Sequence, residues 1–73
     1  MITVYGIEGN LATVALLKCL ANNQLAYKYI EITDDMKFIH VVPTINITKN
    51  NASYALHGFS IDTLNKILGI LSQ

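Results

Sequence analysis

The first nineteen residues, MITVYGIEGNLATVALLKC (1–19), predict a strand, a tight loop and the first half of a helix. Residues 2–5 alternate and are β-branched or aromatic, as in a strand, and two glycines then mark a loop. A mostly apolar run predicts a helix over about 11–22, with Asn10 as its N-cap. A loop that leads into a helix N-terminus is a common place for chemistry, because free backbone N–H groups point outward there.

The remaining residues predict three more strands and a second helix. The strands are expected at about 26–31, 41–48 and 52–56, and only a single helical turn fits between the first two of these. Ser60 is expected to cap a helix over 61–71. The last helix places its expected apolar face at helical spacing, on Ile61, Leu64, Ile67, Leu68 and Leu71.

These elements predict an α/β fold of order strand, helix, strand, strand, strand, helix. The first strand–helix–strand unit is expected to be a right-handed crossover between parallel strands. The two later strands form a hairpin, with Asn50 and Asn51 in its turn, so the four-stranded sheet is mixed. The asparagines that follow the first helix are expected to supply its left-handed C-terminal residue.

The composition describes one small domain, covering residues 1–73, with few charges. Charged residues make up 14% of the chain, against a usual ~25%, so apolar surface must be well hidden or shown to a partner. The five cations are scattered lysines, which argues against a nucleic-acid partner. Neither a membrane span nor a signal peptide is apparent, and a single cysteine fits a reducing compartment, so a cytoplasmic protein is expected.

Three short motifs carry a family resemblance. They are the opening strand with its loop, the Val-Val-Pro-Thr of residues 41–44, and Gly58-Phe59 before the last helix. In this order they resemble the glutaredoxins, the smallest form of the thioredoxin fold. The stretch 58–62 is most similar to the NrdH-redoxins, which deliver electrons to ribonucleotide reductase. The resemblance covers nearly the whole chain and implies a cis proline at Pro43.

The chain departs from the family where the family does its chemistry. The Cys-x-x-Cys motif corresponds to Asn10 and Thr13, the middle helix is shortened or absent, and Ile7 and Glu8 replace a basic stretch that helps to hold glutathione. Thiol–disulfide exchange needs a thiolate as nucleophile and a second thiol to release the mixed disulfide. Dithiol catalysis is therefore excluded, and no catalytic residue is predicted in this loop.

Three other residues have side chains that could take part in catalysis or bind a metal ion. Cys19 is expected to be a small apolar residue on the buried side of the first helix, although a reactive monothiol is the alternative. His40 and His57 are expected to be surface or edge residues, because two imidazoles without further ligands make a weak metal pair. No metal or cofactor is therefore predicted, apart from glutathione as an alternative ligand.

The resemblance implies a groove that needs no cysteine. In the family, the backbone beside the cis proline pairs with an extended peptide or glutathione, a form of strand addition. The predicted function is a non-catalytic redoxin-fold protein that binds a protein partner, for example a small inhibitor or adaptor of viral or mobile-element origin. The alternatives are a residual thiol–disulfide oxidoreductase that uses Cys19, and a glutathione-binding module. The predicted binding surface comprises Asn10, Leu11, Ala12, Thr13, Val42, Pro43, Gly58, Phe59 and Ser60.

Overall fold

The computed structural model describes residues 1–72 and contains a four-stranded mixed sheet with two helices. The elements are β1 (Ile2–Gly6), α1 (Leu11–Asn22), β2 (Lys28–Glu31), β3 (Thr44–Lys49), β4 (Ala52–His57) and α2 (Ile61–Leu71). This order confirms the expected α/β arrangement. The first helix has the predicted bounds, and so does the last.

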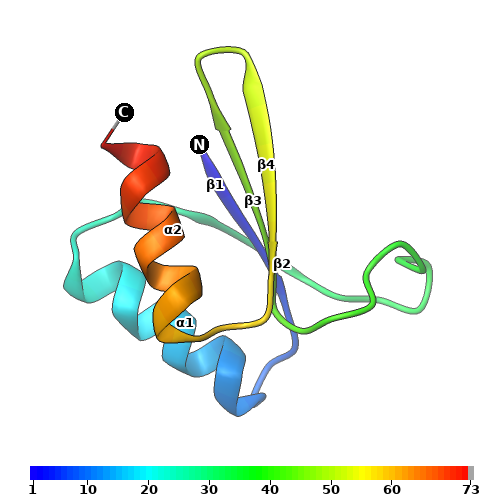
Figure 1. Cartoon of the computed structure of the whole chain (residues 1–73). Helices are drawn as coiled ribbons and strands as arrows, with labels where there is room; N and C mark the ends of the chain where they lie inside the picture. The colour runs from blue at the N-terminus through cyan, green and yellow to red at the C-terminus, as the bar shows by residue number, and fades with distance from the viewer. Residues whose placement is uncertain (73) are drawn as a thin grey trace.

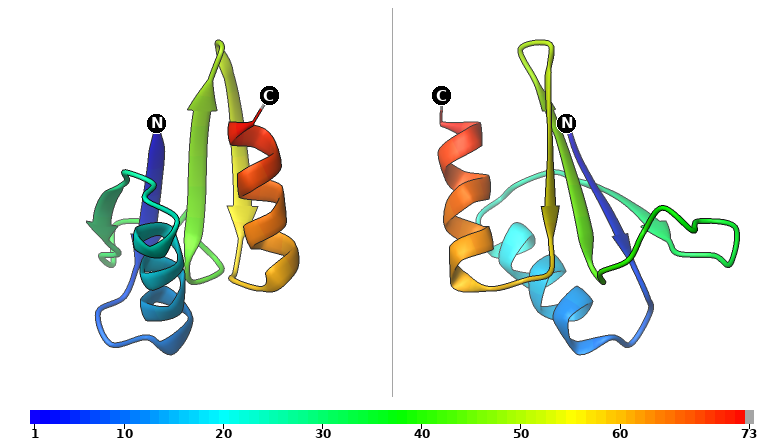
Figure 2. Two further views of the ribbon diagram at one scale, coloured as in Figure 1. Left: turned by 90° about the vertical axis from the view of Figure 1, so that its left-hand side faces the viewer. Right: turned by 45° about the vertical axis from the view of Figure 1, so that its right-hand side comes forward.

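The sheet is organised around β1, in the strand order β2-β1-β3-β4. β1 pairs with β2 in parallel and with β3 in antiparallel register, and β3 pairs with β4 as an antiparallel hairpin. Parallel neighbours need a crossover, which α1 provides here. Both helices lie on the same face of the sheet and begin at the same end of it (Figure 1 and Figure 2).

The core lies between this face and the two helices. Successive residues of a strand point to opposite faces, so alternate residues of β1 and β3 supply the inner side. One turn of helix returns a side chain to the same face, which gives each helix its own inward row. The buried apolar residues are Ile2, Val4, Leu16, Leu20, Ile45, Ile47, Ile67 and Ile70.

The strand bounds differ from the prediction at five places, two of which are one-residue extensions at the ends of β3 (Lys49) and β4 (His57). β2 begins at Lys28 rather than at residue 26, and β3 begins at Thr44 rather than at residue 41. Proline has no N–H to donate to a strand partner, so the ladder starts after Pro43. The Val42–Pro43 peptide bond is cis, as the resemblance implied. Gly6, predicted as a loop residue, is the last residue of β1 and pairs with β2.

The buried face of α2 also differs from the predicted one. Ile61 is 78% exposed and Leu68 is 36% exposed, although both were expected in the core. Ile67 is fully buried as predicted, and Thr63 and Ile70 complete the buried row. Apolar residues lie on more than one side of α2, so their spacing in the sequence did not determine which side packs against the sheet.

The residues with positive φ are those expected from the sequence in the β3–β4 turn, but not at the end of α1. Asn50 and Asn51 both have positive φ, of 54° and 66°, as a two-residue hairpin turn of type I′ requires. After α1, however, the left-handed residue is Gln24 with φ of 58°, whereas Asn23 is the C-cap with φ of −92°. The asparagine prediction for that position was therefore wrong.

The segment between β2 and β3 contains two turns and no helix among the described residues. Met36 N–H donates to the Thr33 carbonyl at 3.0 Å, and Ile39 N–H donates to the Met36 carbonyl at 3.1 Å. The segment projects on the side of the sheet away from the helices (Figure 1). There the ring of Phe38 packs edge-on against Tyr5, with 6.1 Å between ring centroids. The expected shortening or loss of a middle helix is confirmed.

Candidate functional site

The loop between β1 and α1 is fixed by an asparagine–threonine pair. Asn10 Oδ1 accepts hydrogen bonds from the backbone N–H of Thr13 at 2.9 Å and from its hydroxyl at 3.0 Å. Thr13 Oγ1 in turn accepts the N–H of Ile7 at 3.4 Å. Thr13 is only 1% exposed, so its side chain supports the loop from beneath and does not face a partner. Asn10 and Thr13, the residues at the positions of the two cysteines in the glutaredoxin motif, therefore form the N-terminal cap of α1.

The segment before β3 is joined to the connection between β4 and α2. Gly58 N–H donates to the Pro43 carbonyl at 2.8 Å. Gly58 has φ of +76°, and a Cβ atom there would lie 3.7 Å from Val41 Cγ1, so Val41 lies against this glycine. Pro43 is fully buried. Val42 is half-buried, and its backbone N–H and carbonyl form no hydrogen bond within residues 1–72.

The start of α2 repeats the capping arrangement of α1. Ser60 Oγ accepts the N–H of Thr63 at 3.2 Å, as expected for the N-cap. Ser60 itself is exposed, whereas Phe59 is half-buried and packs against the core. Phe59 therefore contributes to the core as well as to the surface.

Two large apolar side chains are exposed where the helices begin. Leu11, the first residue of α1, is 86% exposed, and Ile61, the first residue of α2, is 78% exposed. The prediction included Leu11 but placed Ile61 in the core. The sequence feature that could have predicted the exposure of Ile61 is its position directly after Ser60, the N-cap residue. The helix-end surface is defined here as Asn10, Leu11, Ala12, Val41, Val42, Gly58, Phe59, Ser60 and Ile61.

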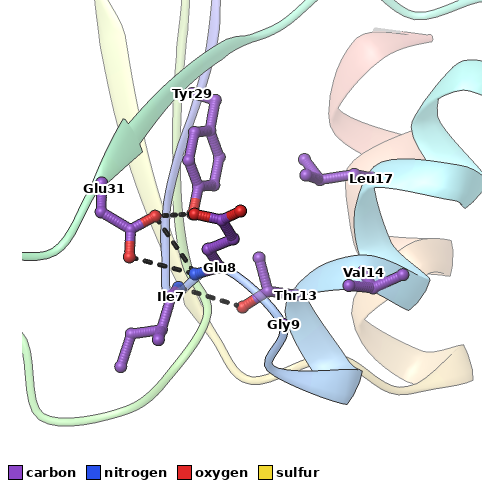
Figure 3. A pocket seen from close by; sticks show the side chains of 8 residues that line it. All are labelled: Ile7, Glu8, Gly9, Thr13, Val14, Leu17, Tyr29 and Glu31. Atoms are coloured by element: carbon purple, nitrogen blue, oxygen red, sulfur yellow. Dashed lines mark hydrogen bonds between the residues drawn. The ribbon is translucent and has the colours of Figure 1, made fainter.

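A pocket lies on the other side of the same loop, between α1 and β2 (Figure 3). Its volume is about 210 Å³. It is lined by Ile7, Glu8, Gly9, Thr13, Val14, Leu17, Tyr29 and Glu31. No sequence prediction included it, because its walls come from two stretches that are far apart in the chain.

The Glu31 carboxylate ties β2 to the loop. Glu8 N–H donates to Glu31 Oε1 at 3.1 Å and to Oε2 at 3.0 Å, and the Tyr29 hydroxyl donates to Oε1 at 2.6 Å. The hydrogen bonds from Tyr29 and then from Glu8 hold the pKa of Glu31 below its ordinary value. Desolvation, followed by the hydrogen bond to Glu31, raises the pKa of Tyr29 to about 12.

These pKa shifts predict that the contributions of Tyr29 and Glu31 to the stability of the protein depend on pH in opposite directions. The Tyr29 contribution to stability is complete below the ordinary tyrosine pKa of 10 and is lost as the pH rises through about 12. The Glu31 contribution is present above the ordinary glutamate pKa and is lost as the pH falls through the lowered value.

The measurement is an absorbance titration of tyrosinate formation, combined with urea unfolding at several pH values. We expect the Glu31→Gln variant to titrate Tyr29 at a lower pH than wild type and to lose the acid-side dependence assigned to Glu31. An unchanged Tyr29 titration in that variant would contradict the coupling between the two side chains.

Cys19, His40 and His57 do not line the pocket, and only His57, which directly precedes Gly58, adjoins the helix-end surface. Cys19 is on α1 about two turns beyond the loop, and it is half-buried rather than fully buried. His40 and His57 are both exposed. Within residues 1–72, His, Cys, Asp and Glu side chains form no group of three or more that would suit a metal ion. No helix in this range is long and apolar enough to cross a membrane.

Comparisons of the chain with protein-family models, with curated proteins and with solved structures gave no match.

Proposed function

We propose that the chain is a non-catalytic binding protein with a minimal thioredoxin-like fold of the glutaredoxin type. It holds an extended segment of a protein partner on the helix-end surface. The observation that carries this proposal is the Val42 backbone, which has no hydrogen bond within residues 1–72, while its neighbours Val41 and Pro43 both contact Gly58. The element order and the parallel pairing of β1 with β2 support the fold assignment.

Strand addition is the binding mode that suits this backbone. A partner strand pairs its own N–H and carbonyl groups with those of Val42, which gives affinity without a specific side chain. Leu11 and Ile61 add apolar surface at the same end of the molecule. Covering one such side chain contributes about 1.5–3 kcal/mol before the costs of association.

Binding is favoured over catalysis because the loop has no nucleophile. Asn10 and Thr13 are engaged in capping α1, and neither supplies a thiolate. Cys19 is the only thiol of the chain, so a residual oxidoreductase would have to act through that half-buried position. We further propose a cytoplasmic location. An enzyme that normally receives electrons from a redoxin, such as ribonucleotide reductase, is the first partner to test.

The decisive experiment compares charge substitutions on two exposed apolar residues. Leu11→Lys places a charge on the helix-end surface, while Phe38→Lys places one at a side chain 68% exposed beyond the opposite face of the sheet. Partners retained by immobilised wild-type protein are identified, and the affinity of the purified partner is measured for each variant. We expect at least a tenfold loss for Leu11→Lys, which is about 1.4 kcal/mol, and little change for Phe38→Lys.

The reverse pattern of losses would overturn the proposed surface. The enzymatic alternative is tested separately, by thiol titration and by reductase-coupled assay of wild type and Cys19→Ser. Rapid reaction of Cys19 at neutral pH, together with loss of activity in Cys19→Ser, would favour the oxidoreductase. Amide shifts at Val42 and Ser60 on addition of glutathione would favour the glutathione-binding module.

A further inference from the structure

The pocket between α1 and β2 combines apolar walls with two carboxylates. Val14, Leu17 and the Tyr29 ring form the apolar part, and Glu8 and Glu31 supply the charge (Figure 3). None of the residues that line it is a lysine, an arginine or a histidine. The pocket therefore presents negative charge beside a surface that would accept hydrocarbon.

Neither carboxylate is neutralised by another described residue. Glu31 receives its hydrogen bonds from the Glu8 N–H and the Tyr29 hydroxyl, both of which are uncharged donors. The Glu8 carboxylate forms no hydrogen bond or ion pair within residues 1–72. A cationic group with an apolar stem would complement both parts of the pocket.

The geometry favours an ammonium over a guanidinium group. The Glu8 N–H already bridges both oxygens of Glu31, at 3.1 and 3.0 Å, so the paired approach of an arginine fork to that carboxylate is occupied. A compact ammonium ion needs only one oxygen from each carboxylate. The volume of about 210 Å³ is below the ~300–1,000 Å³ of drug-sized ligand sites and suits a single side chain.

We propose that this pocket receives a lysine side chain of the bound partner segment. The ammonium group lies between Glu8 and Glu31, and the methylenes lie against Val14 and Leu17. This inference rests on the proposed function, because the partner segment supplies the lysine. Gly9 lines the pocket and the next residue, Asn10, begins the helix-end surface, so the two features adjoin along this loop and a segment bound at Asn10 has only to extend around the loop to reach the pocket.

The test uses butylammonium, which has the stem and charge of a lysine side chain and requires no partner. In an amide NMR titration we expect shifts at Ile7, Gly9 and Leu17, with a weak, millimolar dissociation constant. Glu8→Gln should raise that constant at least threefold, because it removes one charge and retains the backbone N–H that binds Glu31. Asp62→Asn, which removes an exposed charge in the first turn of α2, should leave it unchanged.

Three results would overturn the inference. They are no shifts with butylammonium, equal affinity for the neutral analogue butanol, and equal affinity of wild type and Glu8→Gln. Butylguanidinium should bind more weakly than butylammonium, and tighter binding would overturn the choice of lysine over arginine.

Different results would contradict the lysine pocket and the proposed function. With the captured partner, Glu8→Gln should weaken binding severalfold, whereas Leu11→Lys should weaken it at least tenfold. If Leu11→Lys reduces partner affinity but Glu8→Gln does not, the proposed function stands and the lysine pocket fails. If butylammonium binds but Leu11→Lys leaves the partner affinity unchanged, the ammonium site stands and the proposed surface fails.

Discussion

Replacing Gly6 with alanine should lower the free energy of unfolding by about 2–3 kcal/mol, in the range of overpacked cores. A Cβ atom at this buried residue would lie 2.4 Å from Thr13 Cγ2 and 3.1 Å from Tyr29 Cε1. Thr13 is held in place, because it is 1% exposed and is hydrogen-bonded to Asn10 and Ile7. The added methyl group must therefore displace the loop or the strand.

Two further variants test this explanation by urea unfolding. Gly69→Ala adds the same methyl group within α2, where nothing lies within 4 Å, and should stabilise the protein by up to about 1 kcal/mol. Thr13→Ser in the Gly6→Ala background removes the nearest atom and should restore part of the loss. Wild-type stability for Gly6→Ala would show that the close contact does not constrain the loop.

Replacing Ile67 with alanine should have an effect of comparable or larger size, about 2–5 kcal/mol. Ile67 is fully buried between α2 and the sheet, so the substitution leaves a cavity as well as removing apolar contact. A domain of this length has a total stability of about 4–11 kcal/mol, so the variant should be largely unfolded in mild denaturant.

Ile61→Ala is the matched control, with the same substitution at the start of the same helix. Ile61 is 78% exposed, so its loss should change the free energy of unfolding by no more than about 0.5 kcal/mol. Equal destabilisation by the two substitutions would contradict the exposed position of Ile61 at the start of α2. It would instead favour the apolar face expected from spacing.

Much of the fold could be predicted because its signals are local. Asn10 and Ser60 cap the two helices through side chains that reach only three residues along the chain. The Asn50-Asn51 turn likewise depends on two residues that tolerate positive φ. The buried face of α2 is different, because it depends on which side meets the sheet, and several apolar sides were available.

The candidate site was less predictable, since it is built from long-range contacts. Thr13 was expected to face a partner, but its position beneath the loop depends on the close approach to Gly6. The Glu8–Glu31 contact joins residues 23 positions apart in the chain. In the sequence, Tyr29 and Glu31 are merely alternate residues of a strand, with nothing to indicate the loop that meets them.

The central position of β1 has a consequence for the order in which the sheet can assemble. The β3–β4 hairpin closes through two residues, whereas β1 pairs Ile2 with Ile47, far along the chain. Bringing distant strands together costs loop-closure entropy that increases with the intervening length, so non-local pairings form slowly. The hairpin can therefore exist early as a template, while the strand at the middle of the sheet docks late and completes both halves at once.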